Sequence, residues 1–175
     1  NRSVSSADAS VFDVKVTGSG GIASHSLRPT ALAASQANAS AGYAAATTVV
    51  GTGTLTIDVG TWTGTTAFAV KPGTTAVSIT IGAADNTLEK VRDRINAANA
   101  GVTAEVVFDG TAYRLTMTSR ESGAVNGFRV TAVDDDGNNT NAAGLSNLTY
   151  NPPGGSSRLA RNVTAADATA TLDGL

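Results

Sequence analysis

The stretch NTLEKVRDRINAANAG, residues 86–101, carries the clearest structural signal in the chain. Its apolar residues recur at spacings of three and four, which places them on one stripe of an α-helix: Leu88, Val91, Ile95 and Ala98. Asn86, with Glu89 three residues later, is typical of a capping box, and Gly101 favours a left-handed stop. The polar residues between the stripe positions are expected on the solvated side: Arg92, Asp93, Arg94 and Asn96. The stretch therefore predicts one amphipathic helix.

Apolar and polar residues alternate on both sides of this helix, and each alternating run predicts a β-strand. The predicted strands are 54–59, 67–70, 77–81, 102–109, 111–119 and 128–133. We expect 67–70 and 77–81 to form a hairpin around the turn Lys71-Pro72-Gly73. A single helix among so many strands predicts one antiparallel sheet packed on that helix, because a parallel sheet needs a crossover between most strands.

Signals in the rest of the chain are weaker. VFDVKV, residues 11–16, predicts a strand, and the alternation in 168–172 predicts another. The alanine-rich stretch 27–46 has high helix propensity and little to bury, so we expect a short helix there. Residues 137–157 are typical of a loop, with a short strand at 148–150 as an option. The chain starts without methionine and stops at a turn signal, 173–175, so we expect it to be a piece of a longer protein.

The composition excludes several classes of protein. Hydrophobic residues make up 41% of the 175, but 31 of them are alanine, so we expect thin cores. The absence of cysteine excludes disulfide scaffolds and thiolate metal sites, and the chain has one histidine. The net charge is −2, with no basic run, which argues against nucleic-acid binding. No apolar stretch approaches the ~20 residues of a membrane span, so we expect no membrane contact.

A glycine-rich motif, Gly18-Ser19-Gly20-Gly21-Ile22-Ala23, matches the dinucleotide fingerprint G-x-G-x-x-A. A dinucleotide site needs a helix directly after the glycines, and Pro29 interrupts that helix. The site also needs an acidic residue about 20 positions on, and none occurs between Asp13 and Asp58. We interpret the motif as an ordinary glycine turn and predict no cofactor.

The loop Asp134–Asn138 has the alternating oxygen ligands of a calcium site in Asp134, Asp136 and Asn138. Gly137 stands at the fourth position of that pattern, where a calcium loop has its glycine at the sixth, and no bidentate Glu follows. We interpret the loop as a solvated acidic turn and predict no metal, with calcium as the alternative.

His25 lies between two serines, and Asp8 or Asp13 could complete a catalytic triad in space. No G-x-S-x-G motif exposes a nucleophile, so we interpret His25 as a partly exposed loop residue, expect no catalytic residue and conclude that the chain is not an enzyme. Trp62, in VGTWTGTT, either fills a thin sheet or is an exposed contact for a partner or glycan. We favour the first interpretation.

Residues 51–123 resemble a known module. GTLTI, VSITI, the helix with Ile95-Asn96 and the run DGTAYRLTMTSRESG are similar to the module of bacterial flagellar hook-associated proteins in which a β-hairpin precedes a helix containing Ile-Asn. The flanks SADASVFDVKV, SLRPTALAASQANASAGYA and DATATLDGL narrow the resemblance to the head region of the flagellar filament cap family, hook-associated protein 2. One departure is Pro29, where that family continues a strand. Proline cannot donate to a ladder, so this strand is an edge or ends early.

The resemblance implies a structural protein that is exported unfolded through the flagellar type III system without a cleaved signal peptide. It would form a ring at the extracellular tip of the filament and guide the assembly of flagellin, and in some relatives the head also adheres to host mucin or glycans. The resemblance also implies two small domains of antiparallel sheet, mainly β (α+β), the outer with the single helix and inserted into the inner. Residues 1–47 and 141–175 would form the inner head domain and 48–140 the outer.

The family's terminal helical segments have no counterpart here, so the resemblance is to an excised head region. An alternative remains open, because the Ile-Asn module is shared among flagellar axial proteins. The chain could be the central domain of flagellin or of a hook-filament junction protein.

Overall fold

The computed structural model describes residues 24–152 and 155–174. These residues fall into two compact units, one of 24–28 with 171–174 and the other of 29–170. The predicted strand at 11–16 and the glycine motif 18–23 lie outside the described residues. Among the residues that are described, no helix is both long and apolar enough to span a bilayer.

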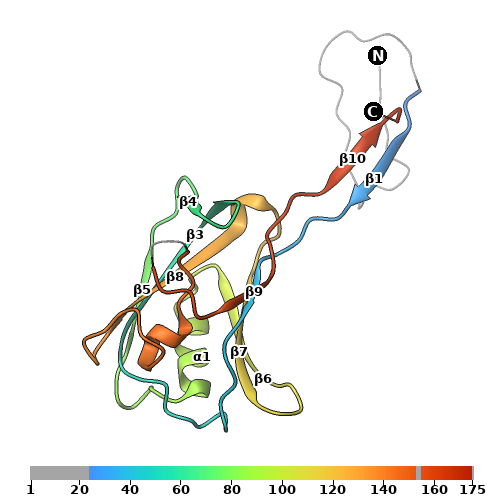
Figure 1. Ribbon diagram of the computed structural model, residues 1–175. Helices are drawn as coiled ribbons and strands as arrows, with labels where there is room; N and C mark the ends of the chain where they lie inside the picture. The colour runs from blue at the N-terminus through green and yellow to red at the C-terminus, as the bar shows by residue number, and fades with distance from the viewer. Residues whose placement is uncertain (1–23, 153–154, 175) are drawn as a thin grey trace. The chain divides into compact units, whose positions relative to one another are not determined.

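The first of two four-stranded sheets in the larger unit is built around β3 (Gly53–Thr63). Its other strands are β4 (Ala67–Val70), β5 (Val77–Ile81) and β8 (Gly127–Asp134). β5 pairs with the first half of β3 and β4 with the second half, while β8 pairs along the opposite edge, and all three pairings are antiparallel (Figure 1).

The second sheet has the strand order β6-β7-β2-β9. Its strands are β6 (Val102–Phe108), β7 (Tyr113–Ser119), β2 (Ala37–Ala39) and β9 (Ala160–Val163). β6 and β7 form the hairpin expected around Asp109-Gly110, with Phe108 opposite Tyr113. The prediction of antiparallel sheets with one α-helix is confirmed, but the prediction of a single sheet is wrong.

The hairpin predicted between 67–70 and 77–81 is also wrong, since β4 and β5 each pair with β3. The reason is the length of β3, whose 11 residues provide an edge for both partners. The connection after β4 stays on that edge, because the Lys71 N–H donates to the Val59 carbonyl at 2.9 Å. The two short strands are therefore placed one after the other along β3.

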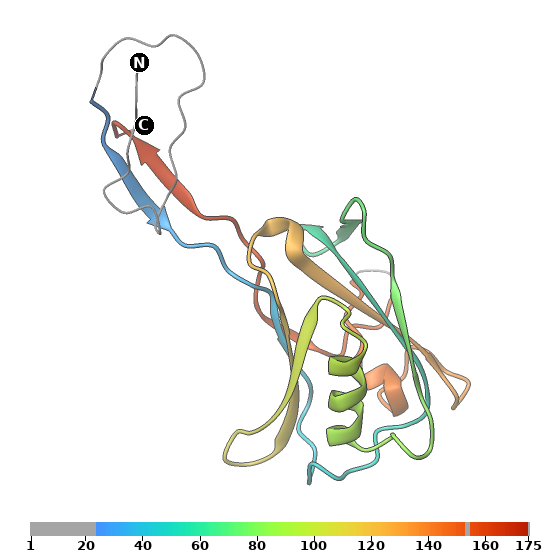
Figure 2. The same cartoon turned by 180° about the vertical axis from the view of Figure 1, so that it is seen from behind.

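The helix α1 (Leu88–Ala97) contacts β6 of one sheet and β5 of the other, so its apolar face closes the core between them (Figure 2). Three of the four predicted stripe residues, Leu88, Val91 and Ile95, are fully buried, and Ala98 packs at the margin. The core also takes in side chains from every strand around the helix: Leu55, Ile57, Ile79, Ile81, Val102, Leu115, Met117 and Phe128. The predicted helix and its orientation are confirmed.

The helix ends differ in part from the sequence prediction. The N-cap is Thr87, with no side-chain capping bond, so the capping box expected at Asn86 is wrong. The first amides instead donate to carbonyls of an earlier loop, Leu88 N–H to Thr48 and Glu89 N–H to Ala46, each at 3.0 Å. The helix does end in a left-handed residue, but that residue is Asn99, with φ +51°, directly after the C-cap Ala98. Gly101, where the stop was predicted, is also left-handed, with φ +77°, but lies two residues further on.

The alanine-rich stretch 27–46 is extended, so the helix predicted there is wrong. It contains β1 (Leu27–Ala31), which pairs with β10 (Thr169–Leu172), and β2, which lies between β7 and β9. Alanine favours helix, but a helix here would have no apolar stripe to bury, and pairing with neighbouring strands overrides the propensity. β1 contains Pro29 and, among the described residues, has β10 as its partner strand. The edge position predicted from Pro29 stays a prediction.

Residues after β8 complete the core of the larger unit. A 3-10 helix η2 (Gly144–Leu148) stands where a loop was expected, and its Leu145 and Leu148 are fully buried against β8. The compact units thus do not follow the bounds predicted at 47 and 140, because β2 and η2 share hydrogen bonds and core contacts with the strands between them. The division of the chain between an inner and an outer head domain of a longer protein stays a prediction.

Candidate functional site

The one histidine lies next to a carboxylate at the end of the described chain. His25 Nδ1 is 2.7 Å from Asp173 Oδ2, and the Ser26 N–H donates to Asp173 Oδ1 at 2.8 Å. The hydrogen bond from His25 lowers the pKa of Asp173, and both side chains are about half exposed. Asp8 and Asp13, the predicted triad partners, lie outside the described residues. This contact fastens the two chain segments that carry β1 and β10.

The loop Asp134–Asn138 is exposed from Asp135 to Asn138, as the predicted solvated turn requires, but Asp134 itself is buried. Asp134 is 6% exposed, and its carboxylate accepts the Ser146 N–H at 2.9 Å and the Ser146 hydroxyl at 3.1 Å. The rest of the loop folds on itself, since Asp136 accepts from the Asn141 amide and from the Asn138 N–H, and these two contacts lower the pKa of Asp136. Asp134 therefore anchors η2 to the end of β8. The described residues contain no cluster of three or more His, Cys, Asp or Glu that could hold a metal.

Trp62 fills the margin of the first sheet, which confirms the favoured interpretation. Its indole N–H donates to the Phe128 carbonyl at 2.9 Å, and its ring lies 4.8 Å from that of Phe68 and 5.2 Å from that of Tyr150. The Arg161 guanidinium lies 5.9 Å from the Trp62 ring. Trp62 thus packs the first sheet against Tyr150 and Arg161, which follow β8 in the sequence.

The Ile-Asn pair of the helix performs two separate structural tasks. Ile95 is fully buried in the core. Asn96, expected on the solvated side, instead donates its amide to the Ala104 carbonyl and accepts the Ala104 N–H, both at 2.8 Å. Among the described strands β6 is the edge of its sheet, so the Asn96 side chain takes the place that a further strand would occupy at Ala104.

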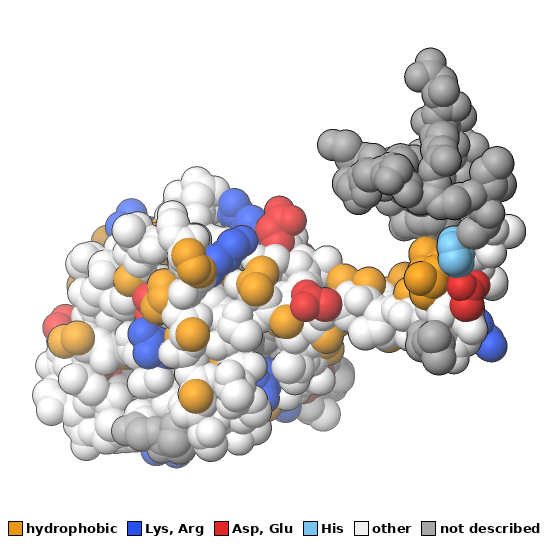
Figure 3. All heavy atoms as spheres, turned by 90° about the horizontal axis from the view of Figure 1, so that it is seen from above, with side chains coloured by type: hydrophobic (Ala, Val, Ile, Leu, Met, Phe, Trp, Pro, Cys, Tyr) orange, Lys and Arg blue, Asp and Glu red, His pale blue; other side chains and the backbone are white. Residues whose placement is uncertain are grey.

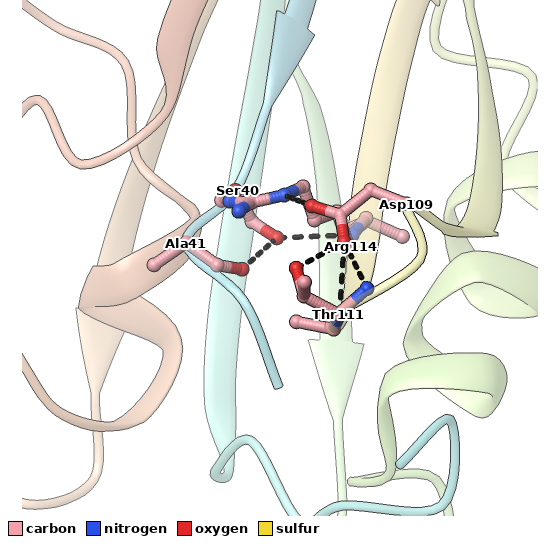
Figure 4. Close-up of polar contacts among 7 residues, drawn as sticks. Ser40, Ala41, Asp109, Thr111 and Arg114 are labelled. Carbon is pink, nitrogen blue, oxygen red and sulfur yellow. Dashed lines mark hydrogen bonds and ion pairs between the residues drawn. The ribbon is translucent and has the colours of Figure 1, made fainter. Parts of the chain in front are cut away.

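The turn of the β6–β7 hairpin is held by one carboxylate. Asp109 Oδ1 accepts the Thr111 hydroxyl at 2.7 Å and the N–H groups of Thr111 and Ala112, each at 2.9 Å. Asp109 Oδ2 accepts from the Arg114 guanidinium, which also donates to the Ser40 carbonyl at 3.0 Å (Figure 4). These contacts, the Thr111 hydroxyl first and Arg114 second, hold the pKa of Asp109 well below its usual range.

The end of this hairpin, residues 107–112, is defined here as the hairpin tip. It carries two exposed apolar side chains, Val107 and Phe108, and the Phe108 ring lies 5.0 Å from that of Tyr113. Beyond Ala104 the edge of β6 has no neighbouring strand in the part of the chain that the structure describes. On the face of the larger unit drawn in Figure 3, apolar and charged side chains are scattered without one large patch. A rigid base with an exposed apolar end makes the hairpin tip the candidate contact surface for assembly.

Part of this site follows from the sequence pattern and part does not. The Asp-Gly turn and the alternation of Tyr113 and Leu115 predicted the hairpin, which the structure confirms. The Arg114 contact to Ser40 joins residues 74 positions apart, and no local pattern signals it. The contact of Asn96 with the edge of β6 was missed because helical periodicity shows only which face of the helix is apolar.

No protein-family model matches the chain. The B-type flagellar hook-associated protein 2 of Pseudomonas aeruginosa is 38% identical over 77 residues, which are 43% of this chain and 16% of that protein. Crystal structures of the D2-D3 domains of the flagellar cap protein FliD from Escherichia coli and of FliD (HAP2) from Pseudomonas aeruginosa give TM-scores of 0.69 and 0.66 at 26% and 27% identity. They cover 86% and 91% of this chain, and 69% and 67% of the chains compared.

The chain is thus similar in sequence and in fold to part of the flagellar cap proteins, which confirms the resemblance found in its motifs. It spans about one sixth of the length of the curated relative from Pseudomonas aeruginosa.

Proposed function

We propose that this chain is part of the head of a flagellar filament cap protein, which acts through assembly and not through catalysis. The observation that carries the proposal is the fold itself, two antiparallel sheets closed by the Ile-Asn helix, which is similar to the D2-D3 domains of FliD over most of this chain. The complete protein would stand as a ring at the extracellular tip of the filament, after export through the flagellar type III system, and would guide the insertion of flagellin.

The hairpin tip would contribute a contact to this assembly. Its turn is held by Asp109 and Arg114, so a partner can bind the exposed Phe108 without ordering a mobile loop first. The chemistry is that of a small apolar contact beside a free strand edge, which suits a neighbouring subunit or flagellin.

Complementation tests the proposal. The complete gene product is expressed in a strain that lacks its own cap protein, and flagellin in the medium and filament length are measured. We expect long filaments and little free flagellin. Unassembled flagellin in the medium at the level of the cap-less strain, with normal export of the product, would count against a cap role.

A matched pair of variants tests the contact at the hairpin tip. Phe108→Ser removes an exposed aromatic side chain from the tip, and Val133→Ser removes an exposed apolar side chain from the far end of β8. We expect shorter filaments for Phe108→Ser and wild-type filaments for Val133→Ser. Equal filament lengths for the two variants would exclude the hairpin tip as an assembly contact and would not contradict the proposed cap role.

Adhesion of the head to host mucin or glycans is a further proposal that rests on the resemblance. Binding of the purified chain to immobilised mucin, compared with a mucin stripped of its glycans, tests it. Equal binding to the two surfaces would exclude glycan recognition.

A further inference from the structure

A pocket of about 310 Å³ lies in the larger unit where the ends of both sheets meet. Its floor is apolar and is formed by Val59, Val77, Ala100 and Gly101. Its rim is polar and is formed by Lys71, Thr74, Thr75, Asn99, Arg120, Glu121 and Asn126. An apolar floor with a few polar groups around it is the usual form of a small-ligand site, and the volume suits a ligand about the size of a monosaccharide.

Two cationic side chains on the rim have neutral partners. Lys71 Nζ donates to the Asn126 side-chain oxygen at 2.7 Å, and the Arg120 guanidinium donates to the Asn99 side-chain oxygen at 2.9 Å. Within the described part of the chain, neither forms an ion pair with a carboxylate. Other arginines, such as Arg129 with Asp58, do form such pairs. The positive charge of Lys71 and Arg120 is therefore left to act on the pocket.

The two asparagines are themselves fixed. Asn126 donates its amide to the Ser122 carbonyl at 2.6 Å, and Asn99 donates to the Ala97 carbonyl at 3.3 Å. Arg120 has a second contact to the backbone, from Nε to the Val102 carbonyl at 3.1 Å. Each cation is thus held beside the pocket before any ligand arrives, which lowers the entropy lost on binding.

We propose that this pocket binds a small hydroxylated monocarboxylate, with the carboxylate between Lys71 and Arg120. An arginine fork and a lysine ammonium are suited to a carboxylate. Glu121 on the same rim reduces the net positive charge to a single unit, which favours a monoanion over a doubly charged phosphate, and its oxygens can accept hydroxyl groups. The apolar floor fits the carbon face of such a ligand. The inference is independent of the cap role.

Nitrogen-15 chemical-shift titration of the purified chain tests the inference with three probes of the same ring. Glucuronate carries one carboxylate, glucose carries no charge, and glucose 6-phosphate is a dianion. We expect saturable shifts with glucuronate at the amides of Thr75, Val77 and Gly101, no saturation with glucose, and weaker binding of the phosphate ester. Equal responses to glucuronate and glucose, or no saturable shift with any probe, would overturn the proposal.

Charge-removing variants assign the binding to the pocket. Lys71→Gln and Arg120→Gln should each weaken glucuronate binding by about tenfold, the loss expected for one charge-assisted contact. Arg158→Gln is the matched control, because Arg158 is a surface arginine that donates to the Thr140 carbonyl and does not line the pocket. Glu121→Gln should tighten binding of the phosphate ester, a gain that loss of folding cannot imitate. Equal weakening by Arg158→Gln, or no gain with Glu121→Gln, would show that the pocket charges do not select the ligand.

Discussion

At the scale of single residues, a few polar side chains hold backbone groups that lie close to them in the sequence. Asn96 forms hydrogen bonds with the backbone N–H and carbonyl of Ala104, and Asp109 accepts hydrogen bonds from the donors of the β6–β7 turn. The sequence predicted the buried face of the helix because periodicity reports burial. It placed Asn96 wrongly, because no periodicity shows which strand edge lies beside the polar face.

Removing the Asn96 amide leaves the Ala104 N–H and carbonyl without a partner in a part-buried place. Asn96→Ala should therefore lower the free energy of unfolding by about 1–3 kcal/mol, measured by urea denaturation. Asn147→Ala, which removes a single exposed amide contact to the Ala142 carbonyl, is the control and should change stability by less than about 0.5 kcal/mol. Equal effects of the two variants would mean that Asn96 does not protect the edge of β6.

Asp109 should titrate well below the ordinary range of an aspartate, because the Thr111 hydroxyl, Arg114 and two backbone N–H groups lower its pKa. A group whose pKa is lowered by folding stabilises the fold above its unfolded pKa of about 3.9, and this contribution is lost as the pH falls toward the folded pKa. Carboxyl carbon-13 shifts of Asp109 recorded from pH 6 downward check this. An Asp109 midpoint at the unfolded value of about 3.9 would contradict the proposed role of Asp109 as the anchor of the hairpin.

At the scale of elements, the order of three strands, a helix and three strands was predictable, whereas the division into two sheets was not. Strand alternation shows that one face of a strand is buried, but it does not show which neighbour pairs with which edge. The structure assigns β4 and β5 to the same edge of β3, and it recruits β2 from a segment with helix-forming composition. Partners that are distant in the sequence decide both outcomes.

A charged side chain on the apolar stripe of α1 should destabilise the fold. Ile95→Asp places a carboxylate in a fully buried site with no cation to pair with it, and we expect a loss above about 3 kcal/mol in the free energy of unfolding. Ala97→Asp puts the same charge on the exposed side of the helix and is the control. A thermal melt of Ile95→Asp that matches the control would contradict the observed orientation of the helix.

The contact between Asp134 and η2 depends on a glycine. Gly144 has φ +57°, and a Cβ there would lie on the Asp134 carboxylate. Gly73 has φ +80° with open space around it, so Gly73→Ala introduces the backbone strain of a left-handed alanine without a steric clash. We expect Gly144→Ala to lower the midpoint of thermal unfolding clearly more than Gly73→Ala does. Equal shifts would show that the Asp134 carboxylate can move away at no cost.

At the scale of the whole molecule, the arrangement of sheets and helix is similar to the D2-D3 domains of flagellar cap proteins, and no catalytic cluster was predicted from the sequence. The motifs of residues 51–123 were sufficient to suggest this relationship, because they contain both the buried stripe and the turn residues. They were not sufficient to predict the pocket beside Lys71 and Arg120, whose lining comes from five separate segments.

Immunogold electron microscopy of flagella that carry the complete, tagged protein tests the central claim most directly. The proposed cap role predicts gold label at the distal tip of each filament, with the shaft and the hook unlabelled. Label along the shaft would indicate a flagellin, and label confined to the junction of hook and filament would indicate a junction protein. Either of those two patterns would contradict the assignment of this chain to the filament cap.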